Sequence, residues 1–365
     1  MNICIIGDGL TSLSLAKNLV NKKINVHIYK EKKILNFNSN RTIGISKNNF
    51  KFFKKKIQNL SKKLFWEINK IDIYSEKSEN NKILNFKENN NNLFYMIKND
   101  LLHQSLKDQL IKSIFFKETE IKNNKFYLQL LNNKKYDLII NCDSNNLFSK
   151  KFFFKKLNKD YLSLAYTTIL NHKIIDNHTA TQIFTKFGPI AFLPISNKQT
   201  SVVYSVDTSK YDYKNHEILD LINQYNPKYE IKRIQKISKF KLQSSNLRNY
   251  YHKNILAFGD CLHKIHPLAG QGFNMTIRDI EAFSNIIQDK IDLGLQLDQN
   301  VLEEFEKKTK HKNFIFSNSI DFIYEFFNFN KKNKSSNLNN LLRYIGENKK
   351  LNNMLIKYAN FGLNI

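Results

Sequence analysis

The amino-acid sequence predicts an α/β fold built on a parallel sheet, with a second sheet in its middle third. Two glycine-containing segments, at residues 7–9 and 259–272, each follow an unbroken apolar run and precede a stretch with helical periodicity. Unbroken apolar runs are typical of central parallel strands, which are buried on both faces. Residues 162–168 and 202–206 instead alternate between apolar and polar positions, as half-buried strands do. The 365 residues suffice for two or three domains.

Composition excludes several classes of protein. Hydrophobic residues make up 41% of the chain and charged residues 25%, which is typical of a folded globular protein rather than a disordered one. No window approaches the roughly 18 to 20 unbroken apolar residues that a spanning helix needs. Three cysteines without CxxC spacing predict reduced thiols in a cytoplasmic protein. We expect no cleavable targeting segment before the first motif and, from the His and Cys spacing, no metal site.

The chain is strongly basic, with 58 Lys and Arg against 32 Asp and Glu and a net charge of +26. Such a surplus fits nucleic acid, an anionic membrane surface or acidic ligands. The lysines are scattered, in short runs such as 54–56 and 331–332. Compositional bias is therefore the favoured explanation, and a membrane-surface role is compatible with it. Nucleic-acid binding rests on charge alone, without a basic-aromatic cluster, and we expect none.

The first glycine segment lies in a strand–helix–strand unit. Residues 3–6 form the first apolar run, residues 10–20 carry apolar side chains at helical spacing, and residues 24–29 form a second strand. The tight turn at Gly7 and Gly9 therefore opens a helix, where backbone N–H groups and the helix dipole can hold a pyrophosphate.

This unit departs from the usual dinucleotide pattern at two places. Ser12 replaces the third glycine, and Lys30 takes the position of the acid that binds the adenosine ribose, with Glu31 one residue later. A structural strand–helix–strand unit without a ligand therefore remains an alternative.

The second glycine segment is more specific. An apolar strand at residues 254–258 delivers Gly259 and Asp260 to its carboxyl end, where open α/β sheets bind ligands. A carboxylate at this place suits hydrogen bonds to ribose or ribityl hydroxyls. Pro267 and the Gly270–Gly272 loop then lead into a helix, and a planar ring can approach such a loop closely.

Residues 259–279 closely resemble the second FAD motif of the flavin-dependent aromatic hydroxylases, in particular the UbiH/UbiF/Coq-type monooxygenases of ubiquinone biosynthesis. The family motif runs close to G-D-A-A-H-x-x-H-P-L-A-G-Q-G-x-N. The matching positions are Gly259, Asp260, His263, His266, Pro267, Leu268, Ala269, Gly270, Gln271, Gly272 and Asn274, with Arg278 and Asp279 in register. Residues 41–46, 137–143 and 187–195 are similar to further family segments. Ser144 replaces a family glycine, and residues 98–101 lack a family arginine.

The resemblance implies which residues bind FAD. They are Gly7, Gly9, Leu10, Thr11, Ser12, Glu31, Arg41, Asp143, Gly259, Asp260, Pro267, Gly270, Gln271, Gly272, Phe273 and Asn274. Four of them are implied to be catalytic: Pro267 on the flavin face where oxygen reacts, and Gly270, Gln271 and Gly272, whose backbone stabilises charge on the reduced ring. We interpret His263 and His266 as structural rather than as acid or base.

The implied fold interleaves its domains. A Rossmann-like FAD-binding domain of the aromatic-hydroxylase type comprises residues 1–70, 95–157 and 250–295, and a β-sheet substrate domain comprises 71–94 and 158–249. Residues 296–365 form a C-terminal helical region. Leu162, Leu164, Tyr166 and Thr168 are expected on one strand face. Phe322, Phe326 and Phe329 predict a helix that docks on the core, with an amphipathic membrane or partner surface as the alternative.

The implied activity is that of an NAD(P)H- and FAD-dependent aromatic-ring monooxygenase. NADH or NADPH reduces FAD, O2 adds at the flavin C4a atom, and the hydroperoxide hydroxylates a polyprenylated phenol in ubiquinone biosynthesis. Other ubiquinone-biosynthesis proteins are further expected partners, and the expected location is cytoplasmic, with peripheral contact at the inner face of the membrane as a further hypothesis. Two alternatives stay open: a flavin hydroxylase of another aromatic substrate, and a non-catalytic scaffold, suggested by Ser12, Lys30 and Ser144.

Overall fold

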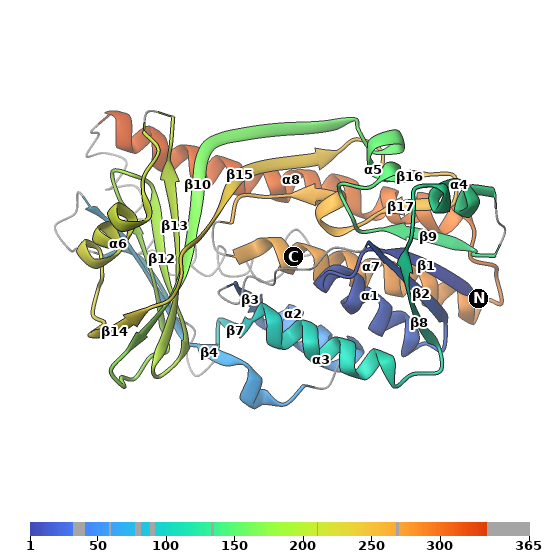
Figure 1. Ribbon diagram of the computed structural model, residues 1–365, viewed down its shortest axis with the longest axis horizontal. Coiled ribbons are helices and arrows are strands. Elements are labelled where there is room, and N and C mark those ends of the chain that lie inside the picture. Colours follow the sequence, from blue (N-terminus) through green and yellow to red (C-terminus); the bar gives the residue numbers. More distant parts are fainter. Residues whose placement is uncertain are drawn as a thin grey trace.

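The structure, a computed structural model, describes residues 1–31, 41–57, 60–76, 82–87, 92–132, 135–209, 211–267 and 270–333. It has a mixed α/β architecture in which a parallel sheet with its helices lies at one end and a large, mainly antiparallel sheet at the other (Figure 1). The long helix α8 (Gln299–Asn333) runs beside both sheets. Within the described residues, no helix is long and apolar enough to cross a membrane.

The first sheet has six strands in the order β16-β17-β9-β1-β2-β8, and all neighbours are parallel except β16 and β17. The strands are β1 (Asn2–Ile6), β2 (Asn25–Glu31), β8 (Phe116–Ile121), β9 (Leu138–Asn141), β16 (Tyr251–His252) and β17 (Ile255–Ala257). The unbroken apolar runs account for the central strands, because Ile3, Ile5 and Ile140 are fully buried. The expected strand–helix–strand unit at the N-terminus is present, with α1 (Leu10–Val20) between β1 and β2.

Helices cover this sheet. Helix α1 contacts α3 (Asn99–Ile111) and α7 (Gln271–Asp292), and α7 contacts α8. The shorter helices are α2 (Lys47–Phe52), α4 (Lys125–Asn132) and α5 (Leu147–Phe152), with single turns at Phe53–Ile57, Lys62–Leu64 and Gly259–Cys261. Their apolar faces join one continuous core with the sheet.

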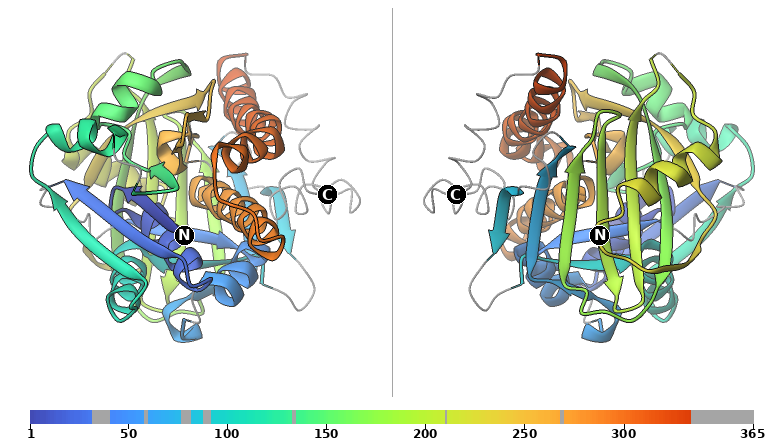
Figure 2. Two further views of the ribbon diagram at one scale, coloured as in Figure 1. Left: turned by 90° about the vertical axis from the view of Figure 1, so that its right-hand side faces the viewer. Right: turned by 90° about the vertical axis from the view of Figure 1, so that its left-hand side faces the viewer.

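The second sheet has nine strands in the order β18-β15-β10-β13-β12-β11-β5-β6, and β14 pairs with β10. The strands are β5 (Lys70–Ser75), β6 (Lys82–Lys87), β10 (Lys156–His172), β11 (Thr179–Phe184), β12 (Pro189–Ser196), β13 (Gln199–Asp207), β14 (Ile231–Ile234), β15 (Ser238–Leu247) and β18 (His263–Lys264). Helix α6 (Asn215–Gln224) lies across its outer face and buries Ile218 and Ile222 there (Figure 2). A small third sheet, β3 (Thr42–Ser46), β7 (Phe94–Lys98) and β4 (Trp66–Ile68), completes the fold. The domain boundaries given above remain predictions.

The expected strand face at residues 162–168 is wrong at its first position. Leu162 is 61% exposed and has a φ of +49°, whereas Tyr166 and Thr168 are buried. The pairing of β10 with β15 shifts register between Asp160 and Leu164. Between these two pairs the chain advances four residues along β10 but only two along β15, and the left-handed backbone at Leu162 interrupts the extended conformation on which the period of two depends.

Helix α8 docks on the core, and Phe322 is not part of the face that docks. Val301, Leu302 and Phe305 are fully buried, and Tyr324 lies in a second cluster beside Leu242 and Met275. Phe322 is 69% exposed on the other side of the helix. The side chains of Phe326, Phe327 and Phe329 lie outside the described residues.

Gly188 is essential to the turn before β12. Its φ is +142°, and a Cβ atom at this position would lie 2.0 Å from the carbonyl oxygen of Ser205. We therefore expect Gly188→Ala to lower the free energy of unfolding by about 2 kcal/mol or more, because backbone strain of this kind alone costs about 1 to 3 kcal/mol. Urea denaturation measures the loss. Gly294→Ala is the matched control, since Gly294 also has a positive φ, +66°, but has no atom within 4 Å of the added carbon.

Candidate functional site

The two glycine segments of the sequence meet in the structure. A Cβ atom on Gly259, whose φ is +61°, would lie 2.5 Å from Cγ2 and 2.8 Å from Oγ1 of Thr11. Thr11 lies in the first turn of α1, directly after the first glycine segment. Only glycine allows this close approach, so the packing of these two segments requires glycine at position 259.

The first segment presents an open helix N-terminus. Gly7 has a φ of +105° and donates its N–H to the carbonyl oxygen of Tyr29 at 2.8 Å. Gly9 is the N-cap of α1, and no side chain caps this helix. A Cβ atom on Gly9 would meet nothing within 4 Å. An uncapped N-terminus without an acidic residue in its first turn is suited to an anion such as a pyrophosphate.

The carboxyl ends of β1, β9 and β17 gather at this place. A Cβ atom on Gly7 would lie 3.6 Å from Cβ of Asp143, which follows β9. Burial raises the pKa of the Cys142 thiol to about 12, and the negative charges of the nearby Asp143 and Asp260 carboxylates add to the rise. Both carboxylates therefore lie near one thiol, and Oγ of Ser12 lies 3.4 Å from the position of a Cβ atom on Gly7. Asp260 is exposed and follows β17, as the sequence predicts.

A contact with α3, which the sequence does not reveal, holds the glycine turn at residues 7–9. Nε2 of His103, a buried residue of α3, donates to the backbone carbonyl of Asp8 at 2.8 Å. Burial raises the pKa of the Asp8 carboxyl, and the positive charges of His103, Lys30 and Lys107 oppose this rise. No local motif marks His103, because its partner is remote in the sequence.

The end of β2 differs from the usual ribose-binding arrangement. Lys30 forms an ion pair with Glu118 of β8, which Lys107 also approaches at 3.4 Å. Burial would raise the pKa of Glu118, but these two lysines outweigh it and hold the pKa below its ordinary value. Glu31, the last residue of β2, lies close to the hydroxyl of Tyr127, whose pKa is raised by burial and by that carboxylate. A role of Glu31 in ribose binding stays a prediction.

The loop of the second segment leads into α7. Gly270 is the N-cap, with a φ of +63°, and donates its N–H to the carbonyl oxygen of Pro267 at 3.0 Å. The nearest atom to a Cβ on Gly270 would be the backbone nitrogen of Gly44, at 3.8 Å. Oε1 of Gln271 is buried and has no hydrogen-bond partner within the described part of the chain. Leu268 and Ala269 lie outside the described residues.

Asn274 fastens this loop to the third sheet. Its side-chain oxygen accepts from the N–H of Ser46 at 2.8 Å and from Nδ2 of Asn49 at 2.9 Å, and its Nδ2 donates to the carbonyl of Gly44 at 2.9 Å. Phe273 is half-buried against the main core. The structure thus gives Asn274 a positioning role, and its direct contact with a cofactor stays a prediction, as does that of Arg41 at the start of β3.

The two histidines of the motif are buried, one in a hydrogen bond and one in an aromatic stack. Nε2 of His263 is 2.5 Å from Oδ2 of Asp279, and Oδ1 of Asp279 accepts from Nδ2 of Asn313 at 2.9 Å. This chain of contacts joins β18, α7 and α8. His266 stacks on Tyr324 with ring centres 4.2 Å apart, and burial lowers its pKa to about 3. Both positions fit the structural interpretation given above.

Comparisons with known proteins agree with this geometry. A family model described as an FAD binding domain matches residues 169–291, about a third of the chain. A mitochondrial ubiquinone biosynthesis monooxygenase COQ6 from Dictyostelium discoideum is 26% identical over 186 residues, which cover 41% of this chain and 38% of the relative. The 3-demethoxyubiquinol 3-hydroxylase of Escherichia coli K12 is 26% identical over 155 residues, 41% of this chain and 40% of that protein. The matches thus span about two-fifths of these relatives.

The likeness in structure extends over the whole chain. The p-nitrophenol 4-monooxygenase PnpA of Pseudomonas putida DLL-E4 superposes with a TM-score of 0.78 at 11% identity, covering 98% of both chains. Klebsiella pneumoniae HpxO, complexed with FAD and uric acid, gives a TM-score of 0.73 at 13% identity, over 98% of this chain and 96% of the other. At such low identity these matches establish the fold, and the predicted aromatic-hydroxylase architecture is confirmed.

Proposed function

We propose that this chain, a relative of the ubiquinone-biosynthesis monooxygenases with the fold of aromatic hydroxylases, is an FAD-dependent monooxygenase that hydroxylates the ring of a polyprenylated phenol with NAD(P)H and O2. The observation that carries the proposal is the meeting of the two glycine segments, where Gly259 packs on Thr11 at the open end of α1. A cytoplasmic location, and contact with other ubiquinone-biosynthesis proteins, belong to the same proposal.

The residues present fit FAD. The positions of Gly9 and Gly270 leave open space where a side chain would intrude, and Oε1 of Gln271 is a buried acceptor without a partner in the described part of the chain. The N–H groups at the start of α1 would hold the pyrophosphate. Asp260 would accept hydrogen bonds from ribityl hydroxyls, and the 270–272 backbone would lie against the ring.

Hydride acceptance from NAD(P)H and activation of O2 are chemistry that FAD would supply. The chain would orient the flavin ring and stabilise the charge that develops on it. The backbone N–H groups of Gln271 and Gly272 open α7 and would stabilise negative charge on the reduced ring, because fixed dipoles need no reorganisation as charge develops. Asn274 keeps that loop on β3 through its hydrogen bonds to Ser46 and Gly44.

An apolar wall beside this loop supports a hydrophobic substrate. A Cβ atom on Gly44 would lie 3.4 Å from Sδ of Met96 and 3.4 Å from the ring of Phe94. Met96 belongs to a small buried cluster with Ile68 and Ala180, between the third sheet and the nine-stranded sheet. Since Gly44 also borders Gly270, an apolar ring bound against this wall would lie close to the loop.

The visible absorption spectrum of the purified protein, before and after FAD is added, tests the proposal. We expect flavin bands that bleach when NAD(P)H is added under anaerobic conditions and return with O2. Turnover of a prenylated phenol in preference to a free phenolic acid would then identify the substrate class, and the reverse preference would favour the alternative hydroxylase. A folded protein that stays colourless with excess FAD would overturn the proposal and favour the scaffold alternative, in which the altered motifs at Ser12, Lys30 and Ser144 no longer hold the cofactor.

Asp260→Ala is expected to weaken FAD binding about 10- to 150-fold, because a hydrogen bond to a charged group contributes about 1.5 to 3 kcal/mol. Asp260 is exposed, so the variant should unfold at the same urea concentration as the parent protein. Fluorescence titration with FAD measures the effect. Asp176→Ala is the matched control, because Asp176 is also exposed but precedes β11 at the far end of the molecule. Unchanged FAD affinity in Asp260→Ala would contradict the placement of the ribityl chain.

A further inference from the structure

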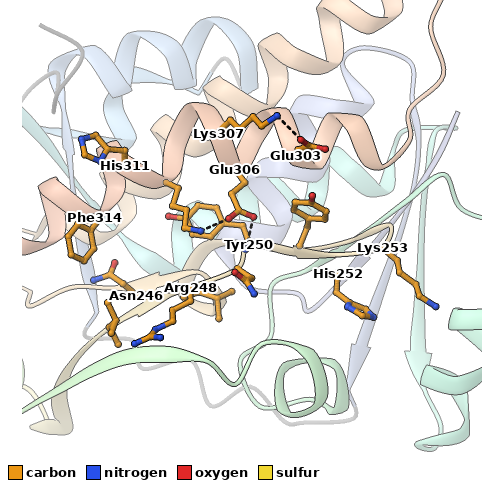
Figure 3. Close-up of a pocket in the computed structure, with 15 residues that line it drawn as sticks. Asn246, Arg248, Tyr250, His252, Lys253, Glu303, Glu306, Lys307, His311 and Phe314 are labelled. Carbon is orange, nitrogen blue, oxygen red and sulfur yellow. Dashed lines mark hydrogen bonds and ion pairs between the residues drawn. The ribbon is translucent and has the colours of Figure 1, made fainter.

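One hollow in the molecule lies apart from the glycine segments. It is a groove of about 1120 Å³ between α8 and the chain that leads from β15 through β16 (Figure 3). Its volume is somewhat above the roughly 300 to 1,000 Å³ of typical small-molecule pockets. None of its lining residues belongs to the candidate cofactor site. Helix α8 contributes Glu303, Glu306, Lys307, Lys310, His311 and Phe314, the other wall is formed by residues 246–253, and Leu157 of β10 closes one end.

The groove has a surplus of positive charge. Its two carboxylates are already paired, Glu303 with Lys307 at 2.6 Å and Glu306 with Lys310 at 2.5 Å. The second oxygen of Glu306 accepts the N–H of Tyr250 at 3.1 Å. Two further cations remain. Arg248 and Lys253 are exposed and make no ion pair with any residue that the structure describes.

Backbone strain holds one of these cations at the rim. Lys253 has a φ of +52° in the turn between β16 and β17. Such a conformation suits glycine or asparagine, and for other residues it persists only where the surroundings enforce it. Figure 3 shows Lys253 at one end of the groove and Arg248 at the other, beside Asn246 and Phe314.

Exposed apolar side chains flank Arg248. Leu157 and Phe314 line the groove and are 44% and 43% exposed, and Phe154 is 62% exposed. Phe154 precedes Lys155, whose carbonyl accepts the N–H of Arg248 at 2.9 Å, so it lies at the same end. Large apolar groups beside unpaired cations are the combination that the interface of a lipid bilayer accommodates.

We propose that this groove docks the protein on an anionic lipid bilayer, with lipid phosphates at Arg248 and Lys253 and with Phe154, Leu157 and Phe314 in the apolar boundary. Charge decides the occupant. The chain as a whole carries +26, so a second copy of the protein would be repelled from the groove. The last 32 residues of the chain are also basic and would be repelled in the same way. A charge spread over the whole chain also suits a uniformly anionic surface better than a compact acidic peptide.

The test is sedimentation of the full chain with vesicles of phosphatidylcholine alone and of phosphatidylcholine mixed with phosphatidylglycerol. We expect binding to the anionic vesicles only. Since a basic residue near an anionic membrane contributes about 1 kcal/mol, Arg248→Gln and Lys253→Gln should each lower the partition coefficient about fivefold. The matched control is the pair Arg233→Gln and Lys232→Gln, exposed cations of β14 at the opposite end of the molecule (Figure 1).

The outcomes are distinct. Equal losses in the two pairs of variants, or no binding to anionic vesicles, would overturn the proposal. Release from vesicles by inorganic phosphate, beyond that caused by sodium chloride of equal ionic strength, would assign the groove to a free phosphate compound and would also overturn it. Lys253→Gly separates docking from folding: we expect a higher thermal unfolding midpoint, because strain is relieved, together with about fivefold weaker binding. The readout does not involve flavin, so the proposed enzyme activity can fail independently.

Discussion

Gly259→Ala is expected to raise the dissociation constant for FAD at least about tenfold, which equals about 1.4 kcal/mol. The added carbon would lie 2.5 Å from Cγ2 of Thr11, and the φ of +61° disfavours any side chain. Thr11 must therefore move, and the first turn of α1 with it. The N–H groups of that turn are the ones that would hold the pyrophosphate, so their displacement weakens FAD binding.

Two variants separate the collision from the backbone strain. Gly294→Ala places the same methyl group at a φ of +66° in open space, so it should lose a little stability and leave FAD affinity unchanged. Combining Gly259→Ala with Thr11→Ala removes the two closest atoms and should restore most of the affinity. Fluorescence titration with FAD gives the dissociation constants. If the double variant bound as poorly as Gly259→Ala alone, the contact with Thr11 would not be the cause.

Those parts of the fold that depend on local pattern could be predicted from the sequence. The apolar runs at residues 3–6 and 254–258 became β1 and β17, and the helical spacing after each glycine segment became α1 and α7. Central parallel strands are recognisable because burial on both faces leaves no room for polar side chains. Where the pattern failed, at Leu162, irregular pairing of β10 with β15 and a left-handed backbone leave the side chain exposed, and a period of two contains no signal for that.

The glycine positions of the candidate site could be predicted from the sequence, but most contacts between its side chains could not. Glycine positions follow from positive φ angles and close approaches that few residues allow, so Gly7 and Gly259 stand out in a chain with only 10 glycines. The contact of His103 with Asp8 and the pairing of Lys30 with Glu118 join residues more than 80 positions apart. Such pairs depend on how α3 and β8 pack against the first turn, which a single sequence does not encode as a motif.

Asp279→Ala is expected to lower the free energy of unfolding by about 3 to 5 kcal/mol, because removing the buried carboxylate leaves two buried polar groups, on His263 and Asn313, without their partner. Asp279 is 1% exposed, and its two oxygens receive His263 at 2.5 Å and Asn313 at 2.9 Å. The substitution therefore disconnects β18, α7 and α8 at one point. With total stabilities of about 5 to 15 kcal/mol, a loss of this size is a large part of the whole.

Urea denaturation of two matched variants identifies the cause. Asp279→Asn keeps the volume and an acceptor for His263, and a rotated Asn313 amide can still bond to it, so the loss should be clearly smaller than in Asp279→Ala. Asp292→Ala removes an exposed carboxylate at the end of the same helix and should change little. An equally large loss in Asp279→Asn would show that the negative charge, and not the hydrogen bonds, stabilises the pair with His263. A small loss in Asp279→Ala would mean that packing of α8 through Val301 and Phe305 holds the three elements together without the polar network.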